Sequence, residues 1–301
     1  MSNEVTLHTN TDMTLPGSYE AFMLQSEADK NRLTGQGNNL GNTLPKLRIN
    51  YDAEYENKED KTVRPIPLVR GTWKMEVMKG DTQVVAFAET VIFRPFLRTY
   101  RYSVYDAEKN TSLLNSTMFK SWGDAVIDDS GMEFKAAKYR KGVIAMRPEL
   151  EGPLQCQQNL FGTVTMSDAK DMHGATVAVT DIPCVWMTKG ASFMPVANTI
   201  SELTERKVAM YSVAFNLTTA RAKKGQVTYF TPVMAVSTQN LTFSKDDFTM
   251  LKAFSDTING ENSYIFDKFK KIGAKAASNK VAVEFAGVGS NLGDDFNDAI
   301  A

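Results

Sequence analysis

The sequence is poor in the residues that most catalytic and metal sites need, with 2 histidines and 2 cysteines in 301 residues. Two cysteines cannot form a disulfide framework, and this usage is typical of a reducing compartment such as the cytoplasm. No run approaches the roughly 18 apolar residues of a membrane-spanning helix, and the N-terminal segment lacks the basic start and apolar stretch of a signal peptide. We therefore expect a cytoplasmic protein without a membrane role.

Catalytic and cofactor motifs are equally scarce. His8 lies in a polar stretch, so a histidine-based hydrolase would depend on His173 alone. GxxxxGK[ST] is absent, and too few residues follow GVGSNLG to build a dinucleotide-binding unit. Cys156, His173, Cys184 and Asp171 could in principle hold zinc, but they lack the Cys-x-x-Cys spacing of a zinc finger. The sequence predicts a non-enzymatic protein without cofactor or metal, although dispersed aspartates leave a metal-dependent nuclease open.

Charge is balanced in total, with 34 basic and 35 acidic residues, but it is unevenly distributed. Residues 206–245 contain six basic and no acidic residues, and residues 135–147 contain five basic and no acidic residues. The segment from Phe285 onward holds three aspartates and no basic residue. This asymmetry favours a polyanion-binding surface with an acidic interaction tail, whereas scattered solvated faces are the alternative interpretation.

Hydrophobic patterning divides the chain into four parts: a polar arm at 1–43, a β-rich body at 44–243, a helical segment at 244–284 and an acidic flexible tail at 285–301. In the body, β-branched and aromatic runs separated by turn residues predict strands. They lie at 69–77, 82–93, 98–106, 113–122, 161–168, 175–189, 208–222 and 226–238. Helices are expected at 18–33, at 193–208 and at 245–277, the last as a pair broken at Asn259–Gly260. The spacing predicts a mainly β fold, an antiparallel barrel or sandwich, with a few mostly C-terminal helices.

The stretch FRPFLRTYRYSVYD at 93–106 interleaves cations and rings. Alternation in a strand would place Arg94, Phe96, Arg98, Tyr100 and Tyr102 on one face. Single-stranded nucleic acid needs this combination, because guanidinium groups meet phosphates and flat side chains stack on unpaired bases. The alternative interpretation is an exposed strand with cross-strand aromatic and arginine pairs.

Three further segments repeat the combination. NLTTARAKKGQVTYFTP predicts a hairpin with Arg221, Lys223 and Lys224 near its turn and Tyr229 on the following strand. MFKSWGD places Lys120 near Trp122, and PCVWMTKG places a tryptophan near a lysine. A tryptophan in a strand is more often core than stacking platform, so the hypothesis depends on the recurrence.

LPKLRINY, the arginine-rich strand, the KKGQVTYFTP hairpin and the ending DDFNDAIA together resemble the single-stranded DNA-binding proteins of tailed bacteriophages. The resemblance covers roughly residues 44–301. It implies an elaborated OB-fold barrel, a role in phage DNA replication and recombination, and an acidic tail that contacts replication partners. Many such tails end on an aromatic residue, whereas Phe296 lies five residues inside the end of this sequence.

The sequence therefore predicts a protein that coats single-stranded DNA in the host cytoplasm without sequence specificity. The residues expected to bind nucleic acid are Arg94, Phe96, Arg98, Tyr100, Arg101, Tyr102, Lys120, Trp122, Arg221, Lys223, Lys224 and Tyr229. The residues expected to bind partner proteins are Asp294, Asp295, Phe296 and Asp298. The alternative is a phage structural or assembly protein without a nucleic-acid role. The sequence leaves the oligomeric state open.

Overall fold

The fold was obtained as a computed structural model, which describes residues 44–52, 54–56, 63–65, 70–79, 82–106, 109 and 111–278. The chain divides into two units, residues 1–44 and 45–301, and the architecture below belongs to the second. The predicted polar arm and acidic tail, including Asp294, Asp295, Phe296 and Asp298, lie outside the described residues.

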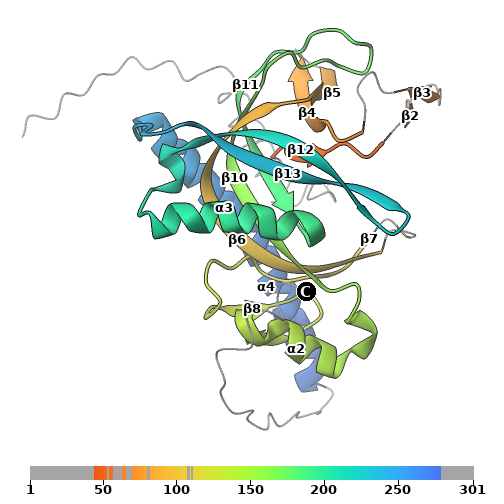
Figure 1. Ribbon diagram of the computed structural model, residues 1–301. Coiled ribbons are helices and arrows are strands. Elements are labelled where there is room, and N and C mark those ends of the chain that lie inside the picture. The colour runs from red at the N-terminus through yellow and green to blue at the C-terminus, as the bar shows by residue number, and fades with distance from the viewer. Residues whose placement is uncertain are drawn as a thin grey trace, which may run out of the picture. The chain divides into compact units, whose positions relative to one another are not determined.

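The described part is mainly β, as predicted, and its elements are named as in Figure 1. The strands are β1 (Lys46–Ile49), β2 (Glu54–Glu56), β3 (Val63–Pro65), β4 (Trp73–Lys79), β5 (Thr82–Ala88), β6 (Val91–Asp106), β7 (Thr111–Asn115), β8 (Ala125–Ile127), β9 (Glu133–Lys135), β10 (Gln155–Met166), β11 (Val179–Thr188), β12 (Ala214–Lys224) and β13 (Val227–Thr238). The helices are α2 (Ala136–Met146), α3 (Phe193–Glu205) and α4 (Lys245–Ser278), with short 3-10 turns η2 (Pro148–Leu150), η3 (Gly190–Ser192) and η4 (Met210–Ser212).

Nine of these strands form one mixed sheet in the order β13-β12-β6-β10-β11-β1-β4-β5, with β7 as a further neighbour of β6. All neighbours are antiparallel except β1 and β11, which run parallel. The 16-residue strand β6 pairs along its length with β10, while β12 and β7 pair with its first and last residues. The long strands β6 and β10 therefore connect the two halves of the sheet.

The sheet curls so that its β4 side reaches β12 and β13. The Trp73 indole donates to the carbonyl of Leu217 at 3.1 Å, and Thr219 donates to the carbonyl of Gly71. These bonds are made by side chains, and the backbone ladders of the described strands form no closed barrel. The OB-like barrel thus stays a prediction.

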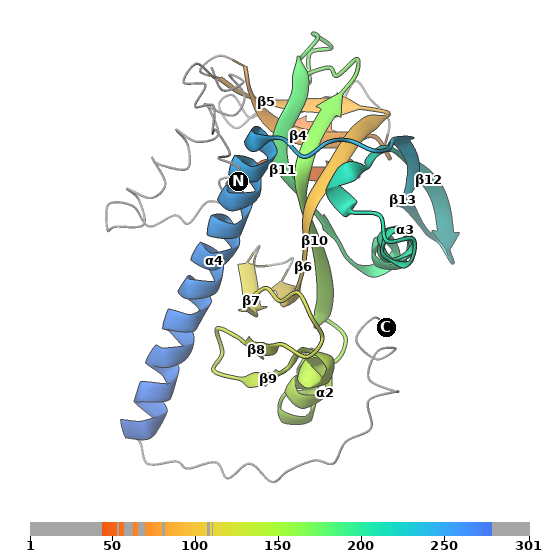
Figure 2. The same ribbon diagram turned by 90° about the vertical axis from the view of Figure 1, so that its left-hand side faces the viewer.

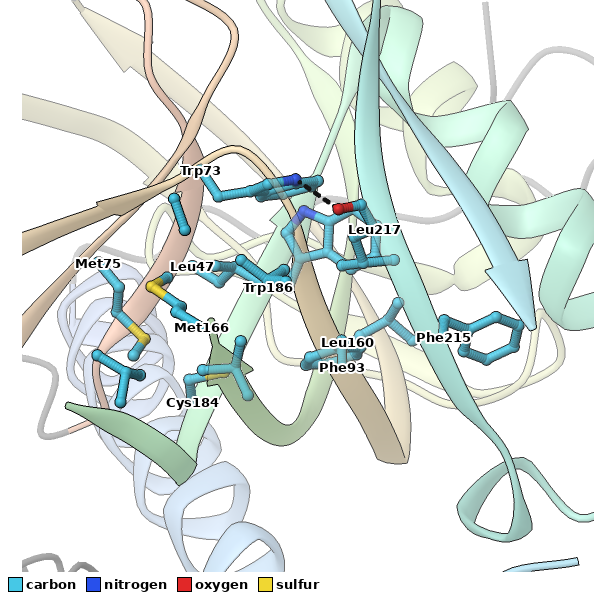
Figure 3. Packing of buried hydrophobic residues seen from close by; sticks show 14 of the residues in the cluster. Leu47, Trp73, Met75, Phe93, Leu160, Met166, Cys184, Trp186, Phe215 and Leu217 are labelled. Carbon is cyan, nitrogen blue, oxygen red and sulfur yellow. Dashed lines mark hydrogen bonds between the residues drawn. The ribbon is translucent and has the colours of Figure 1, made fainter. Parts of the chain in front are cut away.

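The curled sheet and α3 enclose a first hydrophobic core, whose packing Figure 3 shows. The rings of Trp73 and Phe93 each meet the Trp186 ring edge-on, with centroids 5.3 and 5.6 Å away. The side of the sheet that carries these residues is called the inner face. On α3, Val196, Ile200 and Leu203 follow helical spacing and pack onto this face.

A second core lies at the other end of β6 and β10, where inner-face residues of β6, β7 and β10 pack against α2 and β8. Tyr102 is fully buried and stacks on Tyr139 of α2 at 4.6 Å, and burial raises the pKa of both phenols. The basic segment 135–147 was not predicted to be helical, although most of it forms α2. The helix was hard to recognise because buried residues occupy only three of its eleven positions.

The C-terminal helix α4 packs on the opposite side of β6 and β10, called the outer face, as Figure 2 shows. Phe254, Ile258 and Ile265 are buried along its inward side. Ser244 and Asp247 form a reciprocal capping box at the start of the helix. The predicted break at Asn259–Gly260 is wrong, because buried residues before and after it hold one continuous 34-residue helix against the sheet. None of the helices in the described ranges has the length and apolar composition needed to cross a bilayer.

Gly162 of β10 is expected to be sensitive to substitution. A Cβ atom there would overlap the carbonyl oxygen of Arg94 and lie 2.8 Å from the Phe93 ring. Gly162→Ala should therefore lower the free energy of unfolding by about 2 kcal/mol, measured by urea denaturation. Gly152→Ala is the matched control, since its Cβ meets nothing within 4 Å, and should change stability by less than about 0.5 kcal/mol. Equal effects at both positions would contradict this account.

Candidate nucleic-acid interface

A β-bulge divides the cations of β6 between the two faces of the sheet. Leu97 pairs with Phe161 and Pro95 pairs with Gly162, so Phe96 is an extra residue without a partner on β10. The alternation shifts by one position at this point. Arg94 and Arg101 consequently lie on the outer face, whereas Arg98 lies on the inner face. The prediction that Arg94 and Arg98 share one face is therefore wrong.

Carboxylates of α4 bind the two outer arginines. The Arg94 guanidinium donates to both carboxylate oxygens of Asp247 at 3.1 Å, and also to the carbonyls of Tyr211 and Thr242. Arg101 donates to Glu261 at 2.6 Å. Asn262, the residue after Glu261, exchanges two hydrogen bonds with the backbone of Met118. We correct the assignment of Arg94 and Arg101 to phosphate binding, because both guanidinium groups fasten α4 to the sheet.

Three predicted stacking rings are buried. Phe96, Tyr100 and Tyr102 are 5%, 7% and 0% exposed. Phe96 packs against Phe254 of α4, and the hydroxyl of Tyr102 donates to the carbonyl of Ala136. We correct these three assignments too, since an unpaired base cannot stack on a ring whose faces are covered by the core.

The remaining β6 cation belongs to a cluster that we call the junction site: Arg98, Tyr100, Trp122, Gln158 and Thr188, at the boundary of the two cores. The half-buried Arg98 holds its guanidinium 5.4 Å from the centroid of the Tyr100 ring. Trp122, also half-buried, lies 5.2 Å from the same ring. Within the described ranges the Arg98 guanidinium has no hydrogen-bond or carboxylate partner. The exposed Lys120 follows Phe119, which pairs with Tyr100 through the backbone, and thus adds a second cation beside this site.

The β12–β13 hairpin carries the other predicted cations. Arg221, Lys223 and Lys224 are all exposed and form no ion pair with another residue of the described part. Arg221 and Lys223 alternate with the buried Leu217 and so continue the inner face, while Lys224 and Tyr229 point to the opposite face. Tyr229 is half-buried. The predicted set thus occupies both faces of a projecting ribbon.

Two aromatic residues outside the predicted site set, Tyr51 and Phe230, lie beside this ribbon, although the sequence shows Phe230 as an aromatic residue of the second hairpin strand. Phe230 pairs with Arg221 and lies on the inner face, and the ring of Tyr51 meets it edge-on at 6.0 Å. The Tyr51 hydroxyl donates to the carbonyl of Phe230 at 3.0 Å, although Tyr51 is 46% exposed. We call Tyr51, Arg221, Lys223, Lys224 and Phe230 the hairpin site. Tyr51 is the last residue of the motif LPKLRINY, which stood out in the sequence. Nothing in the sequence indicated that it would contact Phe230, which lies 179 residues further along the chain.

Backbone contacts connect the neighbourhoods of the two sites. β13 contacts η3, and η3 begins two residues after Thr188 of the junction site. Both sites include inner-face residues of the same continuous sheet. Three predicted cations without a carboxylate partner in the described part, Arg98, Arg221 and Lys223, therefore lie on connected parts of the inner face, while Lys224 lies on the opposite face of the ribbon.

The possible zinc ligands do not come together. Cys156 belongs to the second core and Cys184 to the first, while His173 is exposed. Burial raises the pKa of both thiols. No group of three metal-binding side chains occurs among the described residues.

Comparisons with known proteins give no family or relative: no protein-family model, curated protein sequence or solved structure matches this chain.

Proposed function

We propose that the chain binds single-stranded DNA without sequence specificity, through the junction and hairpin sites. The observation that carries the proposal is the division of the cations. Arg94 and Arg101 have carboxylate partners on α4, whereas Arg98, Arg221, Lys223 and Lys224 have none in the described part of the chain. Unpaired cations concentrated beside accessible rings suit a flexible polyanion with exposed bases.

The ligand contacts follow from the chemistry of each group. Arg98, Lys120 and the hairpin cations would bind phosphates, with arginine able to hold two oxygens at once. Tyr51 and the half-buried Trp122 and Phe230 would provide stacking surfaces, each worth about 1–3 kcal/mol per base. Duplex DNA conceals its base faces, so only single strands can use both kinds of contact.

A fluorescence anisotropy titration tests the proposal. We expect an oligothymidylate to bind more tightly than a duplex of the same length, with a negative slope of log K against log salt of about 0.7 per phosphate contacted. A slope near zero, or equal affinity for the duplex, would contradict the proposal. The measurement uses the whole chain at two or more salt concentrations.

The biological setting within this proposal rests on the phage resemblance. The chain would coat single strands during phage DNA replication and recombination in the host cytoplasm. Its body would be an elaborated OB-like barrel. Asp294, Asp295, Phe296 and Asp298 would recruit replication or recombination proteins. Removing residues 289–301 and measuring partner capture with recombinant phage replication proteins would test the last point.

A second candidate function is a phage structural or assembly protein. It is favoured by the burial of Phe96, Tyr100 and Tyr102, and by large apolar side chains that α4 exposes. Phe248, Tyr264 and Phe266 are 61%, 41% and 43% exposed on the helix, as expected for a subunit contact. Sedimentation without DNA distinguishes the two functions. Concentration-dependent assembly that Phe248→Ser abolishes, together with no affinity for oligonucleotides, would favour the structural role.

A further inference from the structure

Buried polar side chains form a row on the inner face at the boundary between the two cores. Gln158 is fully buried, and neither polar atom of its amide has a hydrogen-bond partner within the described residues. The hydroxyl oxygen of Thr188, directly opposite on β11, is also buried and without a partner there. Tyr100 lies opposite Gln158 on the other side, on β6. Three adjacent strands thus contribute one row of polar groups.

This row is unfavourable for the stability of the fold. Buried polar groups in folded proteins are nearly always hydrogen-bonded, and a buried amide without a partner destabilises the native state. Leucine has nearly the volume of glutamine and would fill the same space without that cost. Local features that weaken a fold without a structural gain are expected at ligand sites.

The row lies next to the cation and the rings of the junction site. The Arg98 guanidinium is 5.4 Å from the Tyr100 ring centroid, and the rings of Trp122 and Phe193 lie 5.2 and 6.1 Å from the same ring. A strand that follows the unpaired cations would therefore pass the Gln158 row.

We propose that Gln158 and Thr188 bind the edge of one nucleobase of the bound strand while Arg98 holds a neighbouring phosphate. The inference rests on the proposed function and specifies one subsite within it. An amide side chain presents a donor and an acceptor side by side, which matches the edge of a base, whereas a phosphate only accepts. The Thr188 hydroxyl can donate or accept, so the pair accommodates bases of different kinds.

The subsite is closed in this structure, since the amide atoms of Gln158 are buried. Phe193 packs on Tyr100 at the start of α3, close to where the chain leaves the sheet after Thr188. Gly190 lies in the connecting segment with a φ of 55°, and a Cβ there would meet nothing within 4 Å. Entry of a base requires Phe193 to move off Tyr100, and Gly190 gives the segment freedom to do so.

The test is the substitution Gln158→Leu, with thermal melting and affinity measured on the same preparation. The ligands are an oligothymidylate and an abasic deoxyribose-phosphate strand of the same length. We expect the melting temperature to rise by about 2–4 °C, because an unpaired buried amide is removed. Affinity for the oligothymidylate should fall about tenfold, with an unchanged salt slope and unchanged affinity for the abasic strand. Thr188→Val should act in the same direction, which provides a second variant if the first fails to fold.

Asn159→Leu is the matched control. Asn159 neighbours Gln158 in sequence, is 2% exposed and also has an unpartnered side-chain nitrogen within the described part, but it faces outward. Its replacement should leave affinity for both strands unchanged. A lower melting temperature for Gln158→Leu with unchanged affinity would show a structural amide and overturn the subsite, as would equal losses on both strands. A wild-type chain that binds neither strand would instead overturn the proposed function itself.

Discussion

Arg94→Ala is expected to lower the free energy of unfolding by about 3–5 kcal/mol, which corresponds to a fall of roughly 10 °C in Tm. The arginine side chain is 19% exposed and that of its partner Asp247 is 10% exposed, so the substitution leaves a carboxylate in a largely buried position. It also removes the bonds to the carbonyls of Tyr211 and Thr242. Urea denaturation monitored by circular dichroism gives the free energy.

Arg98→Ala, on the same strand, is the matched control. Arg98 has no carboxylate partner among the described residues, so its loss should change stability by less than about 1 kcal/mol. The effects on DNA affinity should be reversed, with Arg98→Ala weakening binding and folded Arg94→Ala binding like the wild type. If Arg94→Ala retains its stability and loses affinity instead, the outer face binds the ligand and our assignment of faces is wrong.

Replacing Lys223 and Lys224 together with alanine is expected to weaken binding to an oligothymidylate about tenfold at low salt. Both side chains are exposed at the tip of a ribbon, so stability should not change. If each contacts one phosphate, the salt slope should become about 1.4 smaller in magnitude. Anisotropy titrations at several salt concentrations measure both quantities.

The control for this experiment removes the same charge elsewhere. Lys252 and Lys271 are exposed on α4, which packs on the outer face, and their joint replacement with alanine should leave both affinity and slope nearly unchanged. Equal losses in the two double variants would indicate general electrostatic attraction by the whole molecule and would exclude a defined hairpin site.

The sequence predicted the mainly β class and most strands, because β-branched and aromatic runs separated by turn residues are local signals. It did not predict which face each β6 residue occupies. Strict alternation placed Arg94 and Arg98 together, but the bulge at Phe96 reverses the pattern between them. Pro95 is a local signal of irregular pairing, because proline within a sheet is found mainly at edges and bulges. The position of the bulge depends on pairing with β10, a strand more than fifty residues away, so the sequence alone could not place it.

The candidate site was predictable only in part for the same reason. Lys223 and Lys224 could be predicted as exposed cations because they adjoin a turn recognisable in the sequence, and residues next to a turn are usually exposed whatever the tertiary fold. Tyr100 and Tyr102 were misassigned because aromatic rings suit both a core and a stacking surface. Gln158 carried no signal, since an unpartnered amide is defined by its surroundings in the folded chain.

The attachment of α4 to the outer face has a consequence for synthesis of the chain. Arg94 and Asp247 are 153 residues apart, and α4 is the last element of the described part to leave the ribosome. Until it emerges, Phe96 and Phe161 lack the apolar cover that Phe254 provides, and Arg94 lacks its carboxylate. The sheet can pair its strands earlier, but it presents an apolar outer face to other nascent chains during that interval. Cover for this part of the outer face thus depends on translation of α4, the last helix of the described part.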